Sequence, residues 1–137
     1  MDAQRPRSAR RRILLVEDDP DIAQLLRVAL ARVLPDVETH HVDNGRDAFE
    51  AATTGDPFDL AICDIMLPGL DGARLLRLWA ANPASTHLPV VILSGVDPDR
   101  LHDIKALPNV IGHHQKPVEL LPFARHVKKV LADIGGG

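Results

Sequence analysis

Charged and hydroxyl side chains stand at the ends of several apolar runs in this sequence. Glu17 and Asp18 follow the first run, Asp64 follows a second, Ser94 ends a third, and Lys116 follows a fourth. Each run has the length of a buried strand. Carboxylates gathered at one place repel one another unless a cation offsets their charge. If the fold brings these strand ends together, the residue types favour a cation site with an adjoining ammonium and hydroxyl.

Asp64 lies at the centre of this set. The apolar residues 60–63 lead into it, and the pattern then breaks at Pro68, Gly69 and Gly72. This places Asp64 at the carboxyl end of a buried strand, where open α/β sheets hold their ligands. The alternative is an ordinary strand-end acid that bonds a loop amide. The matching chemistry at the other strand ends favours a functional site.

The periodicity predicts five strands that alternate with five helices. The expected strands are 13–16, 37–42, 60–63, 89–93 and 110–115. The expected helices are 20–34, 46–53, 72–81, 98–107 and 118–134, the first capped by Asp19 with Pro20 at its first position. This alternation predicts a parallel sheet with right-handed crossovers and helices on both faces, so that all strand ends face one rim.

Composition restricts the function classes. The 137 residues suffice for one domain with its own core. The single cysteine, Cys63, lies in an apolar run and has no partner for a disulfide or for thiol redox chemistry, which favours a reducing, cytoplasmic location. No apolar run approaches the roughly 18 to 20 residues that span a bilayer, and no secretory signal is recognisable, so no membrane association is expected.

Charge is distributed unevenly along the chain. Five arginines against Asp2 give residues 1–12 a charge of +4, which leaves −7 for the remainder of the net −3. The acidic remainder argues against a nucleic-acid surface on the domain. We interpret residues 1–11 as a basic disordered tail, 12–134 as the folded domain, and 135–137 as a flexible end or linker stub.

Other site chemistries fit the sequence less well. His113 and His114 are adjacent in an expected strand, so their side chains point to opposite faces and cannot chelate one zinc ion together. The separation of Asp64 and Asp71 does not match the two-residue acid spacing of aspartate-nucleophile phosphatases. The glycine-rich motifs of dinucleotide and nucleoside triphosphate sites are missing from the sequence.

From about residue 12 to 134 the chain resembles the receiver domain of two-component response regulators, with the single-domain chemotaxis regulators as the nearest type. The resemblance rests on residues 15–19, on 64–72, on Leu93-Ser94-Gly95 and on Lys116-Pro117. It implies a flavodoxin-like α/β fold, that is, a doubly wound five-stranded parallel sheet in the order 2-1-3-4-5 with five helices.

The resemblance also implies the chemistry at the strand ends. Asp64 would accept a phosphoryl group from the phosphohistidine of a histidine kinase and form an aspartyl phosphate. Mg²⁺ would be bound by the side chains of Asp18 and Asp64, by the backbone carbonyl of Met66, and by Glu17 through water. The ion would offset the charge of the carboxylate nucleophile.

Two further residues complete the expected mechanism. Lys116, followed by a cis bond to Pro117, would pair with the phosphoryl oxygens, and with Asp64 before phosphorylation. Ser94 would donate a hydrogen bond to the phosphoryl group and draw the following loop and helix 98–107 inward. Where the family usually carries an aromatic switch residue, this chain has His113. Whether His113 supports the same switch is left open.

The resemblance implies a signalling phosphoprotein that catalyses only its own phosphorylation and slow dephosphorylation, and so is not an enzyme acting on a separate substrate. Expected partners are a histidine kinase or phosphotransfer protein and an unidentified downstream protein, without direct nucleic-acid contact; dimerisation on phosphorylation is left open. Two alternatives also stay open: a degenerate receiver that binds without phosphorylation, and a phosphorelay or hybrid-kinase receiver excised from a larger protein.

No helix-turn-helix follows the last expected helix, so output is expected through protein contact. The resemblance implies that the contact surface comprises the fourth helix, the fifth strand and the fifth helix. The candidate exposed residues on it are Arg100, His102, Lys105, His114 and Lys128.

Overall fold

The computed structural model describes residues 11–67, 71–95 and 98–135. Four predicted features therefore lie at least partly outside the described residues. They are the basic tail up to residue 10, the Pro68-Gly69 turn, the start of the loop after Ser94, and the end of the chain at residues 136–137.

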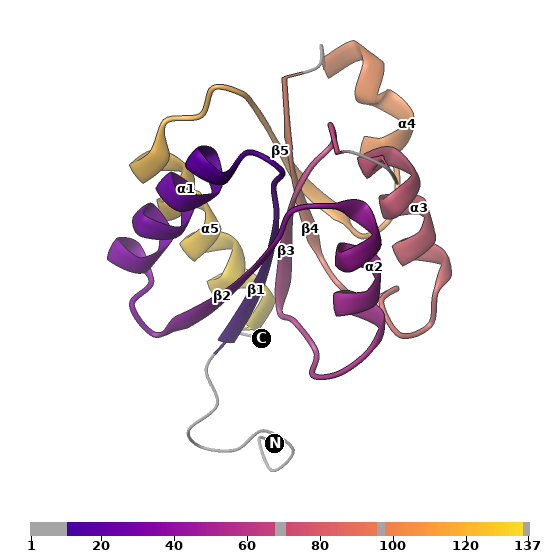
Figure 1. Cartoon of the computed structure of the whole chain (residues 1–137), viewed down its shortest axis with the longest axis horizontal. Helices are drawn as coiled ribbons and strands as arrows, with labels where there is room; N and C mark the ends of the chain where they lie inside the picture. The colour runs from indigo at the N-terminus through magenta and orange to yellow at the C-terminus, as the bar shows by residue number, and fades with distance from the viewer. Residues whose placement is uncertain (1–10, 68–70, 96–97, 136–137) are drawn as a thin grey trace.

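Five parallel strands form one sheet in the order β2-β1-β3-β4-β5, which confirms the predicted doubly wound, flavodoxin-like α/β fold (Figure 1). The strands are β1 (Arg11–Val16), β2 (Val37–Val42), β3 (Leu60–Asp64), β4 (Val90–Ser94) and β5 (Val110–Gln115). The helices are α1 (Pro20–Val33), α2 (Gly45–Thr53), α3 (Gly72–Ala81), α4 (His102–Lys105) and α5 (Leu120–Gly135), with a 3-10 turn at Pro98–Leu101 before α4.

Helices cover both faces of the sheet. Helices α1 and α5 lie on one face, and α2, α3 and α4 lie on the other (Figure 1). Alternation along each strand divides the apolar residues between two cores, so that Leu15 and Ile62 face α1 and α5 while Leu14 and Cys63 face the other three helices. The central strands β3 and β4 are buried throughout, as parallel strands covered on both faces should be.

The structure differs from the sequence prediction at both ends of the domain. Strand β1 begins at Arg11, which pairs with Val37 and whose Nη1 donates a 2.8 Å hydrogen bond to the Leu131 carbonyl. Arg11 therefore belongs to the sheet and not to the tail. At the other end, α5 starts two residues later than predicted, at Leu120, and runs to Gly135.

Two helices differ from what their sequences suggest. In α1, Leu25 has the helical spacing of a core residue but is 52% exposed, whereas Ala23 is buried. The predicted helix 98–107 is a 3-10 turn followed by the four-residue α4. Its apolar anchors Leu101 and Ile104 are buried three residues apart, a spacing that a single tight turn can satisfy. Among the described residues, no helix is long and apolar enough to cross a membrane.

Candidate functional site

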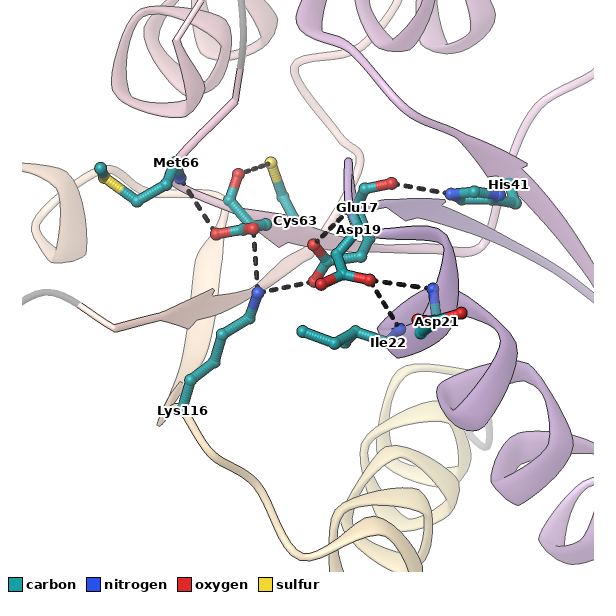
Figure 2. Close-up of polar contacts among 9 residues, drawn as sticks. Glu17, Asp19, Asp21, Ile22, His41, Cys63, Met66 and Lys116 are labelled. Carbon is teal, nitrogen blue, oxygen red and sulfur yellow. Dashed lines mark hydrogen bonds and ion pairs between the residues drawn. The ribbon is translucent and has the colours of Figure 1, made fainter.

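The carboxyl ends of β1, β3 and β5 bring two acids and a lysine into contact (Figure 2). The Nζ of Lys116, just after β5, lies 2.7 Å from Oε1 of Glu17 and 3.0 Å from Oδ2 of Asp64. Glu17 follows β1 and is fully buried, and Asp64 ends β3 and is 2% exposed. Parallel register accounts for this convergence, because it aligns the ends of neighbouring strands at one edge of the sheet.

The loop after β3 holds the second oxygen of Asp64. The backbone N–H of Met66 donates to Oδ1 at 3.0 Å, so each carboxylate oxygen has its own donor. Gly72 permits this loop geometry: a Cβ on Gly72 would lie 2.5 Å from Cα of Ile65 and 2.7 Å from the Asp64 carbonyl oxygen. The glycine therefore lets the start of α3 pack directly on the backbone that carries Asp64.

A third carboxylate completes the acidic cluster. One oxygen each from Glu17, Asp18 and Asp64 lies within 4.8 Å of the others, with Asp18 exposed at the mouth of the cluster. Among the described contacts, the single ammonium of Lys116 bonds two of these three acids. The cluster therefore carries more negative charge than its lysine offsets.

Burial and the neighbouring charges shift the pKa values of Glu17 and Lys116. Burial raises the pKa of Glu17 to about 7, with a further raising contribution from the charge of Asp64, against the lowering effect of its bonds to Lys116 and to the N–H of Asp19. Burial works against the charged form of Lys116, but its bonds to Glu17 and Asp64 outweigh burial and raise its pKa. Lys116 thus stays cationic while Glu17 lacks a full counter-charge.

The donor set of the cluster fits a hard divalent cation. All three groups offer carboxylate oxygens, the ligand type that Mg²⁺ prefers, and the exposure of Asp18 leaves room for the waters that Mg²⁺ keeps. The site is rigid at the β1 side, where Glu17 N–H donates to Val42 and the ring of His41 hydrogen-bonds the Glu17 carbonyl at 2.8 Å. The residues present therefore fit a divalent-cation site of the kind that the resemblance implies.

Ser94 lies beside this cluster, as the last residue of β4. It is fully buried, and its carbonyl accepts a 2.8 Å hydrogen bond from the backbone N–H of Lys116. The lysine is therefore tied to β4 through its backbone and to the acids through its side chain. The peptide bond between Lys116 and Pro117 is cis, as the sequence resemblance implied.

His113 and His114 point to opposite faces of β5, as predicted from their adjacency. On one side, Nε2 of His113 is buried and has no hydrogen-bond partner among the described residues. Burial, with a smaller effect from Lys105, lowers the pKa of His113. On the other side, His114 contacts His126 of α5, a pairing that the sequence analysis did not identify.

A groove that the sequence did not predict lies next to Lys116. It has a volume of about 450 Å³, and its lining is almost entirely apolar. It runs between α1 and the segment that joins β5 to α5, and its lining residues are Ile22, Leu25, Leu93, Lys116, Pro117, Val118 and Leu120. Leu25 is the sequence signal for this groove. The helix α1 carries more long apolar side chains than its core-facing positions hold, and Leu25 is the surplus one.

The predicted contact surface is partly exposed. His102, Lys105 and Lys128 are exposed, and His114 is half-buried. The side chain of Arg100 lies outside the described part of the structure.

Known proteins similar to this chain include a receiver domain family and single regulatory proteins. The family model for the response regulator receiver domain matches residues 13–119. The response regulator receiver protein CpdR of Brucella abortus is 31% identical over 121 residues, which cover 88% of this chain and 97% of that protein. A gliding motility regulatory protein of Myxococcus xanthus is 37% identical over 95 residues, 68% of this chain but only 12% of the relative.

A solved structure supports the same relationship. The signal receiver domain of a signal transduction histidine kinase from Syntrophus aciditrophicus superposes with a TM-score of 0.76 at 32% sequence identity. The match covers 89% of this chain and 90% of that domain. Similar domains thus occur both nearly alone, as in CpdR, and as small parts of much longer proteins.

Proposed function

Because this chain belongs to the response regulator receiver domain family, we propose that it is a phosphoacceptor of a two-component system in which Asp64 takes the phosphoryl group of a phosphohistidine. One observation carries the proposal: a buried carboxylate lies at a sheet edge with a lysine on one oxygen and two further acids within reach. This arrangement matches the needs of phosphoryl transfer, where positioning and charge compensation dominate.

In the proposed reaction an oxygen of Asp64 forms a bond to phosphorus while the bond from phosphorus to the donor imidazole nitrogen breaks. The imidazole leaves with the electron pair of that bond, and Asp64 becomes a mixed anhydride. The N–H of Met66 and the ammonium of Lys116 hold the carboxylate in place before transfer. After transfer, the phosphoryl group lies next to Lys116, and the ammonium binds one of its oxygens.

Mg²⁺ would be held by Asp18 and Asp64, by the Met66 carbonyl, and by Glu17 through water. When bound, it supplies positive charge that lets a carboxylate approach an anionic phosphoryl group. The support in this structure is the acid cluster, in which one lysine faces three carboxylates and burial raises the pKa of Glu17.

We further propose that Ser94 donates a hydrogen bond to the phosphoryl group. The resulting movement of Ser94 would then be transmitted to β5 and to helix α4. Ser94 is already coupled to Lys116 through the backbone, which supports a concerted movement of the two. His113 lies on the side of β5 that faces the core with α4, so it is placed to respond. Such a switch requires two states whose balance the phosphoryl group changes.

The phosphodonor, a histidine kinase or phosphotransfer protein, is proposed to dock on the apolar groove beside Lys116. The groove borders the phosphorylation site, and its rim residue Leu25 is half exposed to solvent. Leu25→Glu should therefore slow transfer from a phosphorylated histidine phosphotransfer protein but leave labelling by acetyl phosphate unchanged. Ile134→Glu, at the far end of α5, is the matched control. Equal slowing with both donors would contradict docking at this groove.

In this proposal the protein is a signalling domain that catalyses only its own phosphorylation and dephosphorylation, and not an enzyme with a separate substrate. The rival function is a binding module that is never phosphorylated. The buried, mutually repelling acids disfavour this rival, because a structural module gains nothing from them.

The direct test is incubation with Mg²⁺ and acetyl phosphate, followed by intact-mass measurement and peptide mapping. We expect a base-labile phosphoryl adduct on Asp64, absent from Asp64→Asn and retained in Asp36→Asn, whose side chain is exposed. Amide spectra with beryllofluoride should shift at Ser94 and α4. An adduct that persists in Asp64→Asn would refute the assignment, and Mg²⁺ binding without any adduct would favour the unphosphorylated module.

A further inference from the structure

Two histidines meet on the α5 side of the sheet, in a site separate from the acid cluster. His114 of β5 and His126 of α5 are joined by a 2.8 Å hydrogen bond between Nε2 and Nδ1. The ring centroids lie 4.7 Å apart and the ring planes are inclined by 57°. Both residues are half-buried, so the pair is not sealed inside the core.

The surrounding residues hold both rings in place. The ring of His126 lies over Gly112 of β5, where a Cβ would make an ordinary van der Waals contact with its Cε1 at 3.5 Å. Phe123 packs edge-on against His114 with ring centroids 4.9 Å apart. Two nitrogen atoms from different elements thus lie close together before any ligand arrives, which lowers the entropic cost of gathering them around an ion.

The hydrogen bond requires that one of the two nitrogens offers a lone pair. One nitrogen must present a lone pair to the other, so at least one imidazole is neutral at the contact. Neutral imidazole nitrogen is the commonest protein ligand for divalent transition metals.

We propose that His114 and His126 form a two-imidazole site for a divalent transition-metal ion such as Zn²⁺, with water in the remaining positions. Zinc binds imidazole nitrogen at about 2.0–2.1 Å, which places two tetrahedral ligands about 3.4 Å apart. The two nitrogens therefore separate by about 0.6 Å from the observed 2.8 Å. The donating imidazole moves its N–H proton to its other nitrogen, so the pair loses no proton overall.

This site differs in ligand chemistry from the acid cluster. Mg²⁺ prefers oxygen ligands, whereas Zn²⁺ readily takes nitrogen. Excess Mg²⁺ therefore occupies the carboxylates and leaves the histidine pair free. A bound ion would connect β5 to α5 close to the cis bond that follows Lys116, and so would stabilise the chain against unfolding.

The test is a Zn²⁺ titration of the full chain in excess Mg²⁺, followed by calorimetry and by the ¹⁵N resonances of the imidazole rings. We expect the ring nitrogens of His114 and His126 to shift together. His114→Gln and His126→Gln should each weaken binding roughly 100-fold, because each leaves one ligand where two acted jointly. His87→Gln, which alters an exposed histidine, is the control and should bind as the parent does.

The parent spectra alone decide the outcome if a variant fails to fold. Shifts confined to other histidines, or no binding in excess Mg²⁺, would overturn the proposal. Binding that is unchanged in both folded variants would overturn it as well. None of these results depends on phosphorylation of Asp64, so the test is independent of the proposed function.

Discussion

Magnesium binding to the acid cluster should weaken as the pH falls below 7. The pKa of Glu17 is raised to about 7, mainly because the carboxylate is buried, so Glu17 is largely protonated in the metal-free protein below that pH. A dication close to Glu17, Asp18 and Asp64 favours the ionised form. Ion binding is therefore coupled to the release of the Glu17 proton.

The size of the effect follows from the pKa. Because Mg²⁺ binding requires the loss of one proton from Glu17, protonation weakens the apparent affinity for Mg²⁺. The weakening factor is one plus the ratio of protonated to ionised Glu17 in the metal-free protein. Relative to the plateau above pH 8, this factor is about 11 at pH 6 and about 100 at pH 5. Each tenfold loss corresponds to about 1.4 kcal/mol of binding free energy.

Isothermal titration with Mg²⁺ between pH 5 and pH 8 measures this profile, and buffers of different ionisation enthalpy give the protons released. Glu17→Gln carries no ionisable proton at this position, so its profile should be nearly flat over the same range. Glu50→Gln changes an exposed glutamate on α2 and should keep the parent slope. A flat parent profile would refute the reasoning, and so would an unchanged slope in Glu17→Gln.

The same pKa has a consequence for stability without metal. The ordinary pKa of 4.5 applies to the unfolded chain, so between pH 4.5 and about 7 the folded state binds the extra proton. Stability from this group is therefore full below pH 4.5 and is lost as the pH rises to 7. The loss is on the order of 3 kcal/mol. Urea unfolding with a chelator present should show Glu17→Gln losing less stability than the parent over this range.

Three local predictions follow from packing and capping. Gly72→Ala should lower the free energy of unfolding by at least about 2 kcal/mol in urea titrations, because its Cβ would overlap the backbone of Ile65. Gly95→Ala, where a Cβ meets nothing within 4 Å, should stay within about 0.5 kcal/mol of the parent. Cys63 should resist alkylation, read by mass, until the chain unfolds, because burial raises the pKa of its thiol. Asp19→Ala should cost about 1 kcal/mol in thermal unfolding, since Oδ1 caps two N–H groups of α1; an unchanged midpoint would contradict that role.

The convergence of Glu17, Asp64 and Lys116 could be predicted from sequence because it depends on few physical facts. Apolar runs identify buried strands, and crossover helices make those strands parallel. Parallel strands then place their carboxyl ends at the same edge. Predicting the strand boundaries to within a residue or two was enough to place these three side chains together. The strand β3 ends at Asp64, one residue later than predicted, and this shift leaves the predicted convergence unchanged.

The helix faces were less predictable because apolar residues outnumber the positions that face the sheet. Leu25 has the spacing of a core residue, yet the sheet is already covered by Leu26, Ala29 and Leu30, so Leu25 projects toward solvent. The contact between His114 and His126 was inaccessible for a related reason. It depends on the rotation of α5 about its axis relative to β5, which leaves no periodic signal in the sequence.

Lys116 connects the proposed chemistry to the proposed movement. Its ammonium is shared between Glu17 and Asp64, and its backbone N–H is bonded to the carbonyl of Ser94. Adding a phosphoryl group to Asp64 would increase the negative charge on one side of that ammonium. This change would move Lys116 toward Asp64. Because its backbone is bonded to Ser94, that movement also acts on the end of β4, where the proposed switch begins.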